Sequence, residues 1–116
     1  GNMNNVIISH LLAAASIILL VICILPRRKP VTRSAMIAHA LCGIALAVLA
    51  LLHGLLANDT PAMLSGKIAW IALMLLLLSA MPKSLRRKTG WMKIHRTLSV
   101  CVFLLILVHI LHAVLI

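Results

Sequence analysis

Apolar residues form four long runs along the chain, with short polar segments between them. The runs cover about residues 6–25, 34–57, 62–81 and 91–116. Each run is close to the ~20 residues that a helix needs to cross ~30 Å of hydrocarbon. Because the segments between the runs are short, consecutive helices must be antiparallel neighbours. The pattern therefore predicts an all-α membrane protein, a four-transmembrane-helix, up-down-up-down bundle that forms a single domain over residues 1–116.

Helix-breaking and charged residues fill the polar segments. Residues 26–33 hold two prolines and four basic side chains, residues 58–61 are Asn-Asp-Thr-Pro, and residues 82–90 begin with proline and end with glycine. Positive charge follows the first run and does not precede it, so we interpret this run as a retained span and not as a secretory signal peptide. The Gly-Asn pair at residues 1–2 is interpreted as a tag remnant.

The composition excludes a soluble globule and several kinds of chemistry. Apolar residues make up 64% of the chain, against roughly 45–50% in soluble domains. The chain has 11 Lys and Arg but a single acid, Asp59, so it has no pair of carboxylates for acid–base catalysis or for a hard metal ion. The three cysteines are odd in number and lie within apolar runs, which argues against a disulfide framework and a thiolate zinc site.

Basic residues are concentrated in the first and third polar segments, which share one side of the predicted bundle. Ten of the eleven lie in or beside these segments: Arg27, Arg28, Lys29, Arg33, Lys83, Arg86, Arg87, Lys88, Lys93 and Arg96. The positive-inside rule places both segments in the cytoplasm and both termini outside. We therefore expect a bacterial inner-membrane protein with periplasmic termini. Since no aromatic residues are interleaved with the charges, we expect contact with anionic lipid and no nucleic-acid partner.

Six histidines are the anomaly in so apolar a chain, and four of them share a spacing. His39 and His53 are 14 residues apart in the second run, and His95 and His109 are 14 residues apart in the fourth. Fourteen residues bring a helix back to nearly the same face, about 21 Å further along its axis. The second and fourth helices run in the same direction because one helix intervenes. We therefore expect His39 and His95 (the inner pair) near the cytoplasmic side, and His53 and His109 (the outer pair) near the other side.

Two histidine pairs that face each other at two depths match the ligands of two b-type haems. An imidazole on each side of the iron gives a low-spin site that transfers electrons and does not bind oxygen. We predict two haem b groups, one bound by the inner pair and one by the outer pair, that carry electrons across the bilayer. A metal site or proton pathway is the competing interpretation, although no acidic residue lies within the four runs.

The histidines and their flanking residues resemble those of the membrane di-haem cytochromes b. The letters W-M-K-I-H-R at residues 91–96 and L-V-H at residues 107–109 are similar to the W-x-x-x-H-R and L-x-H pattern of such helices. The resemblance includes the haem-bearing bundle of the cytochrome b subunit of quinol–cytochrome c reductases, the ferric reductase and NADPH oxidase core and, more loosely, bacterial cytochrome b561 proteins. It extends over about residues 6–116. No flavin or nicotinamide domain and no quinone-site motif accompany it, so it does not imply a complete ferric reductase.

Several residues near the histidine pairs have two interpretations. Arg33 and Arg96, with Lys93, lie at the level of the inner pair. They either neutralise haem propionates or orient the protein by snorkelling to the membrane surface. Gly43 and Gly54 either leave room for a porphyrin plane or serve helix packing.

The remaining two histidines, His10 and His112, have no assigned role. His112 follows His95 by 17 residues, which places it about 100° from the face of His95, so His109 is the better ligand. Near an outer haem, these two histidines would accept protons from a quinol, contact a propionate, or lie at the interface without chemistry.

The primary hypothesis is transmembrane electron transfer through two bis-histidine haems, with a quinone/quinol pool or a redox partner protein as partner. The sequence leaves open whether the chain is itself an oxidoreductase, a homodimer or a subunit of a larger complex. One alternative is a small four-span transporter of the size of the small multidrug-resistance exporters. Those exporters rely on a glutamate in the first span, and the first apolar run of this chain has no acidic residue. The other is an anchor subunit with incidental histidines.

Overall fold

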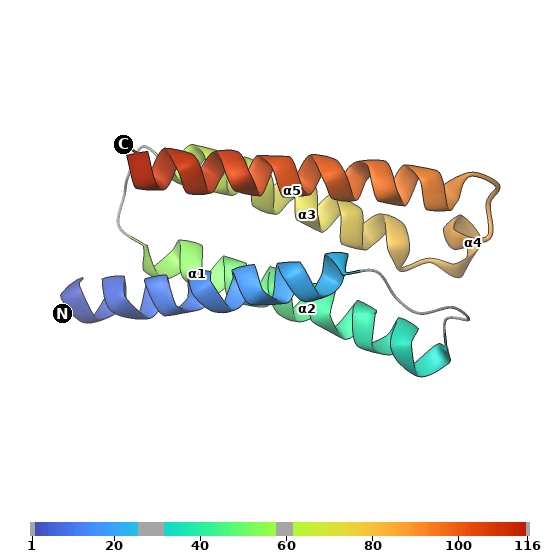
Figure 1. The fold of residues 1–116 in the computed structure, drawn as a ribbon, viewed down its shortest axis with the longest axis horizontal. Helices are drawn as coiled ribbons and strands as arrows, with labels where there is room; N and C mark the ends of the chain where they lie inside the picture. The colour runs from blue at the N-terminus through green and yellow to red at the C-terminus, as the bar shows by residue number, and fades with distance from the viewer. Residues whose placement is uncertain (1, 26–31, 58–61, 116) are drawn as a thin grey trace. The chain divides into compact units, whose positions relative to one another are not determined.

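The described part of the chain consists of five helices and contains no strand. The computed structural model describes residues 2–25, 32–57 and 62–115. The helices are α1 (Asn2–Ile24), α2 (Arg33–Leu56), α3 (Met63–Ala80), α4 (Lys83–Arg86) and α5 (Trp91–Leu115), as Figure 1 shows.

Four of these helices, α1, α2, α3 and α5, are long and apolar enough to cross a membrane. They coincide with the four apolar runs and differ from them mainly at one boundary, because α1 begins at Asn2 and so includes a polar first turn. The predicted all-α class with four membrane-spanning helices is confirmed. The chain is an integral membrane protein.

The segment before α5 differs from the sequence-based expectation, which placed no helix there. Pro82 (φ −70°, ψ 127°) precedes the four-residue helix α4, and its carbonyl accepts from the backbone N–H groups of Leu85 and Arg86 at 3.2 Å. Proline provides this start because its ring fixes φ near the value that a helix needs. Gly90 then adopts φ +81°, a left-handed conformation that suits glycine, immediately before α5.

Some sequence-based predictions lie outside the described residues. These are the basic loop at residues 26–31, with Arg27, Arg28 and Lys29, and the turn at residues 58–61, with Asp59. The start of α2 is described: the side chain of Thr32 accepts from the backbone N–H of Ala35 at 3.1 Å and so caps the helix.

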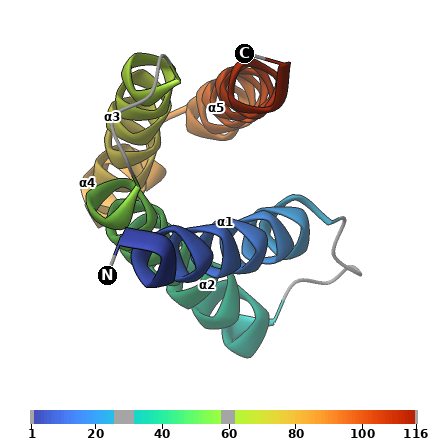
Figure 2. The same ribbon diagram turned by 90° about the vertical axis from the view of Figure 1, so that its left-hand side faces the viewer.

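The chain divides into two compact units, residues 1–58 (hairpin 1) and residues 59–116 (hairpin 2). In hairpin 1, α1 packs antiparallel to α2, and in hairpin 2, α3 packs antiparallel to α5 (Figures 1 and 2). Each hairpin buries only a few apolar side chains: Leu20, Leu46 and Ala47 in hairpin 1, and Ala62, Ala69, Leu73 and Val102 in hairpin 2. Most large apolar side chains of the described residues are exposed or half-buried, as expected for helices that face lipid.

Candidate functional site

The four spaced histidines lie on equivalent stripes of α2 and α5. Midway between His39 and His53 lies Leu46, which is 3% exposed, and midway between the histidines of α5 lies Val102, also 3% exposed. Seven residues bring a helix back to nearly the same face, so each histidine stripe includes the most buried residue of its helix. All four imidazoles are half-buried. His53 contacts α1 and His109 contacts the start of α3, so these two imidazoles lie at the contact between the two helices of their own hairpins.

His53 is held by the first turns of α1. Its Nδ1 lies 2.8 Å from the carbonyl oxygen of Ser9 and 2.8 Å from Ser9 Oγ. The hydroxyl of Ser9 donates to the carbonyl oxygen of His53 at 3.0 Å. A carbonyl only accepts, so Nδ1 carries the proton of the neutral ring and the lone pair is on Nε2.

His109 is held in the same way by the start of α3. Its Nδ1 lies 3.0 Å from the carbonyl oxygen of Ala62 and 3.1 Å from Ser65 Oγ. The Ser65 hydroxyl donates to the Ala62 carbonyl at 2.9 Å. The same argument assigns the proton of the neutral His109 ring to Nδ1 and its lone pair to Nε2.

Gly66 allows the His109 ring to approach α3 this closely. A Cβ at Gly66 would lie 2.9 Å from Cε1 of His109 and 3.2 Å from its Nδ1. The sequence-based reasoning missed Gly66 and chose Gly43 and Gly54 instead. At Gly54 a Cβ would meet nothing within 4 Å, so no close contact inside hairpin 1 requires glycine there.

His95 is oriented by an aromatic ring. The rings of Trp91 and His95 stack with centroids 4.8 Å apart and planes at 20°. Trp91 is fixed in turn, because its Nε1–H donates to the carbonyl oxygen of Ser79 at the end of α3, at 3.1 Å. The W-x-x-x-H spacing thus places a tryptophan one helical turn before the histidine, where the two rings can stack.

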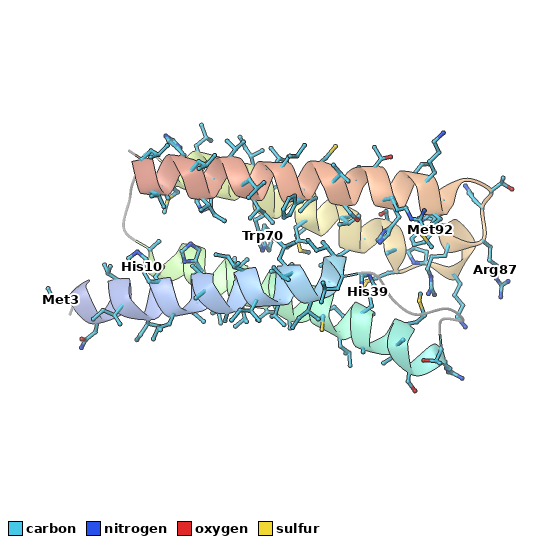
Figure 3. The ribbon with its side chains drawn as sticks, viewed as in Figure 1. Met3, His10, His39, Trp70, Arg87 and Met92 are labelled. Carbon is cyan, nitrogen blue, oxygen red and sulfur yellow. The ribbon has the colours of Figure 1, made fainter. Side chains whose placement is uncertain are left out.

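His39 lies beside the end of α1. A groove of hairpin 1 is lined by Ile22, Cys23, Ala35, Ala38, His39 and Cys42. Figure 3 shows His39 on α2 and His10 on α1, toward opposite ends of hairpin 1. His39 and His53 are 14 residues apart on α2, so they lie about 21 Å apart along this helix.

The other residues singled out in the sequence have varied surroundings. Arg33 in the first turn of α2 and Arg96 next to His95 are both exposed. His10 is also exposed. Nδ1 of His112 lies 3.5 Å from Ser65 Oγ, a weak contact with the serine that also contacts His109. The roles of Arg33 and Arg96 stay predictions, and His10 has no assigned role.

The two hairpins share a sequence register that the sequence-based reasoning did not identify. Identical residues recur 56 positions apart: Ser9 and Ser65, Pro26 and Pro82, Met36 and Met92, His39 and His95, and His53 and His109. The buried Leu46 and Val102 are related by the same offset. This 56-residue repeat is visible in the sequence itself. The matching histidine–serine contacts show that equivalent residues make the same contact in both hairpins.

Among residues 2–25, 32–57 and 62–115, no three His, Cys, Asp or Glu side chains form a group that could hold a metal ion. A bis-histidine haem needs only two protein ligands, because the porphyrin supplies the other nitrogens. Comparison with known proteins adds no further constraint, since no family model, curated protein or solved structure matches the chain.

Proposed function

We propose that this protein is a membrane electron-transfer protein of the di-haem cytochrome b type. One haem b is bound by His39 and His95, and the other by His53 and His109. The single observation that carries the proposal is the hydrogen bond from Nδ1 of both outer-pair histidines to a main-chain carbonyl.

This hydrogen bond is the usual support of a metal-bound histidine. Metal-ligating histidines almost always donate the second ring N–H to a carbonyl or carboxylate, which sets the tautomer and the ring orientation. In His53 and His109 the lone pair is then on Nε2, at the edge of the ring remote from Nδ1.

The bound haems would supply one-electron oxidation and reduction. His39 and His95 would hold one haem and His53 and His109 the other, and an iron held by two imidazoles would transfer electrons without binding small ligands such as oxygen. The 14-residue spacing separates the two levels by about 21 Å along each helix. Arg33 and Arg96 are exposed guanidinium groups near the inner pair, suited to the haem propionates.

The proposed location is a bacterial inner membrane, with the basic segments in the cytoplasm and both termini in the periplasm. The proposed partner is a quinone/quinol pool, or a redox protein that docks on the membrane surface. A quinone is favoured because it diffuses within the bilayer, where the four long helices of this chain lie.

One spectroscopic experiment tests the function. The full chain, expressed with added haem precursor and purified in detergent, should be red and should have a reduced α-band in the b-type range. A pyridine haemochrome assay should give about two haems per chain, as expected for two bis-histidine sites. A variant with all four histidines replaced by alanine is the control. A colourless wild-type protein would overturn the proposal.

A further inference from the structure

We propose that Ser9 and Ser65 are positioning residues of the outer haem. Their hydroxyl oxygens share the Nδ1–H proton of His53 and His109 with a main-chain carbonyl, and so set the orientation and the basicity of the two imidazoles that would hold that haem. This inference rests on the proposed function, because it assigns a role at the same site.

The hydrogen-bond directions make each serine an acceptor toward its histidine. Ser9 uses its own proton on the carbonyl of His53 at 3.0 Å, and Ser65 uses its proton on the carbonyl of Ala62 at 2.9 Å. The oxygen lone pairs then face Nδ1, at 2.8 Å in hairpin 1 and 3.1 Å in hairpin 2. Two acceptors on one N–H resist rotation of the ring more strongly than one.

The repeat supports a shared role for the two serines. Each serine precedes its histidine by 44 residues, although it lies on a different helix. Ser9 is 3% exposed and is the only buried polar side chain among the described residues. Placing a hydroxyl in an apolar contact is costly unless it is hydrogen-bonded. Both serine hydroxyls are hydrogen-bonded, and in each hairpin the serine contacts the equivalent histidine.

The proposal is specific to one level of the membrane. At the inner pair, His95 is stacked on Trp91, and the residue equivalent to Trp91 beside His39 is Ala35. Ser9 and Ser65 contact His53 and His109, which are the two histidines of the outer pair. A change at Ser9 or Ser65 should therefore alter one haem and leave the other unchanged.

The expected chemical effect follows from electron donation by the imidazole. An acceptor on Nδ1–H makes the ring a stronger donor through Nε2. A stronger donor stabilises ferric iron more than ferrous iron and lowers the reduction potential. Loss of one acceptor should therefore raise the potential of the outer haem. The Ser9 and Ser65 effects should add, because they act on opposite ligands of the same haem.

The test uses the full chain with Ser9→Ala, Ser65→Ala and the double variant. Ser9→Thr and Ser65→Thr restore the hydroxyl. Ser16→Ala is a matched control on α1, since this serine donates to the carbonyl of Leu12 on its own helix at 2.8 Å. Lys67→Ala, at an exposed position of α3, is the control for hairpin 2. For each variant we would measure haem content, the two midpoint potentials by redox titration, and the low-spin ferric signals by electron paramagnetic resonance.

The expected result is an upward shift of one potential and a changed g-value pattern of the same haem in each Ser→Ala variant. Both should return toward wild type in the Ser→Thr variants, and the controls should match wild type. If a Ser→Ala variant loses the outer haem, rescue by threonine supports the proposal and failure of that rescue overturns it. Unchanged potentials and signals at full haem content would overturn the proposal and leave the proposed function standing. A wild type without haem would overturn both.

Discussion

The imidazole of His109 lies directly against Gly66, so close that a Cβ on this residue would be 2.9 Å from Cε1 of the ring. We predict that Gly66→Ala displaces the ring. Two hydrogen bonds hold the ring against α3, and a Cβ at Gly66 leaves too little space for it there. The displaced ring should be a poor ligand. The haem content should then fall from about two toward about one per chain, measured by pyridine haemochrome.

Lys67→Ala is the control for the Gly66 variant, because Lys67 is the next residue on α3 and its side chain is exposed. It should retain both haems. Full haem content and an unaltered outer-haem spectrum in Gly66→Ala would show that the close approach of His109 to α3 is unimportant for ligation.

The outer-pair histidines should be required for one haem only. We predict that His53→Ala and His109→Ala each reduce the haem content to about one per chain and leave the inner haem spectrum intact, because each removes one of the two axial ligands. His112→Ala should retain both haems, since His112 makes only a 3.5 Å contact with Ser65. Retention of both haems in His109→Ala would instead identify His112 as the ligand.

Trp91 should affect the inner haem and not the outer one. Trp91→Ala removes both the ring stacked on His95 and the hydrogen bond to the Ser79 carbonyl. Trp91→Phe keeps an aromatic ring but loses the N–H donor. We predict a shift in the inner-haem potential and ferric resonance signal that is larger in Trp91→Ala than in Trp91→Phe. Met92→Ala, at a position that is 49% exposed, is the control. Equal effects on the two haems would contradict this assignment.

The membrane orientation can be tested with reporter fusions. Alkaline phosphatase joined after residue 115 should be active, because the proposed topology places it in the periplasm. The same enzyme joined within residues 83–88 of a truncated chain should be inactive, since the basic segment directs this part to the cytoplasm. The reverse pattern of activity would show the opposite topology, in which the outer pair would lie near the cytoplasm.

The sequence predicted the four long helices well because the signal for each is local. A run of about 20 apolar residues can satisfy its backbone groups in a membrane only as a helix. The exception was α4, which is four residues long and follows Pro82 in a segment that had been expected to lack helix. A helix this short has no periodic pattern to reveal it.

The site was predicted less completely than the helices. The equal spacing in α2 and α5 selected the four histidines, but Ser9, Ser65 and Gly66 were missed. Each of these is an ordinary small residue of a membrane helix when only its own neighbours are considered. Their roles depend on contacts with residues more than 40 positions away, such as the 44-residue separation of Ser65 and His109.

The sequence by itself determined the class of protein, the membrane-spanning helices and the spacing of His39, His53, His95 and His109. All of these follow from composition and from the fixed rise and rotation of a helix. Only the tertiary structure decided which ring nitrogen of His53 and His109 is held by the protein. The reason is that the acceptor is a carbonyl on another helix, and its position beside the ring depends on how the two helices of each hairpin pack.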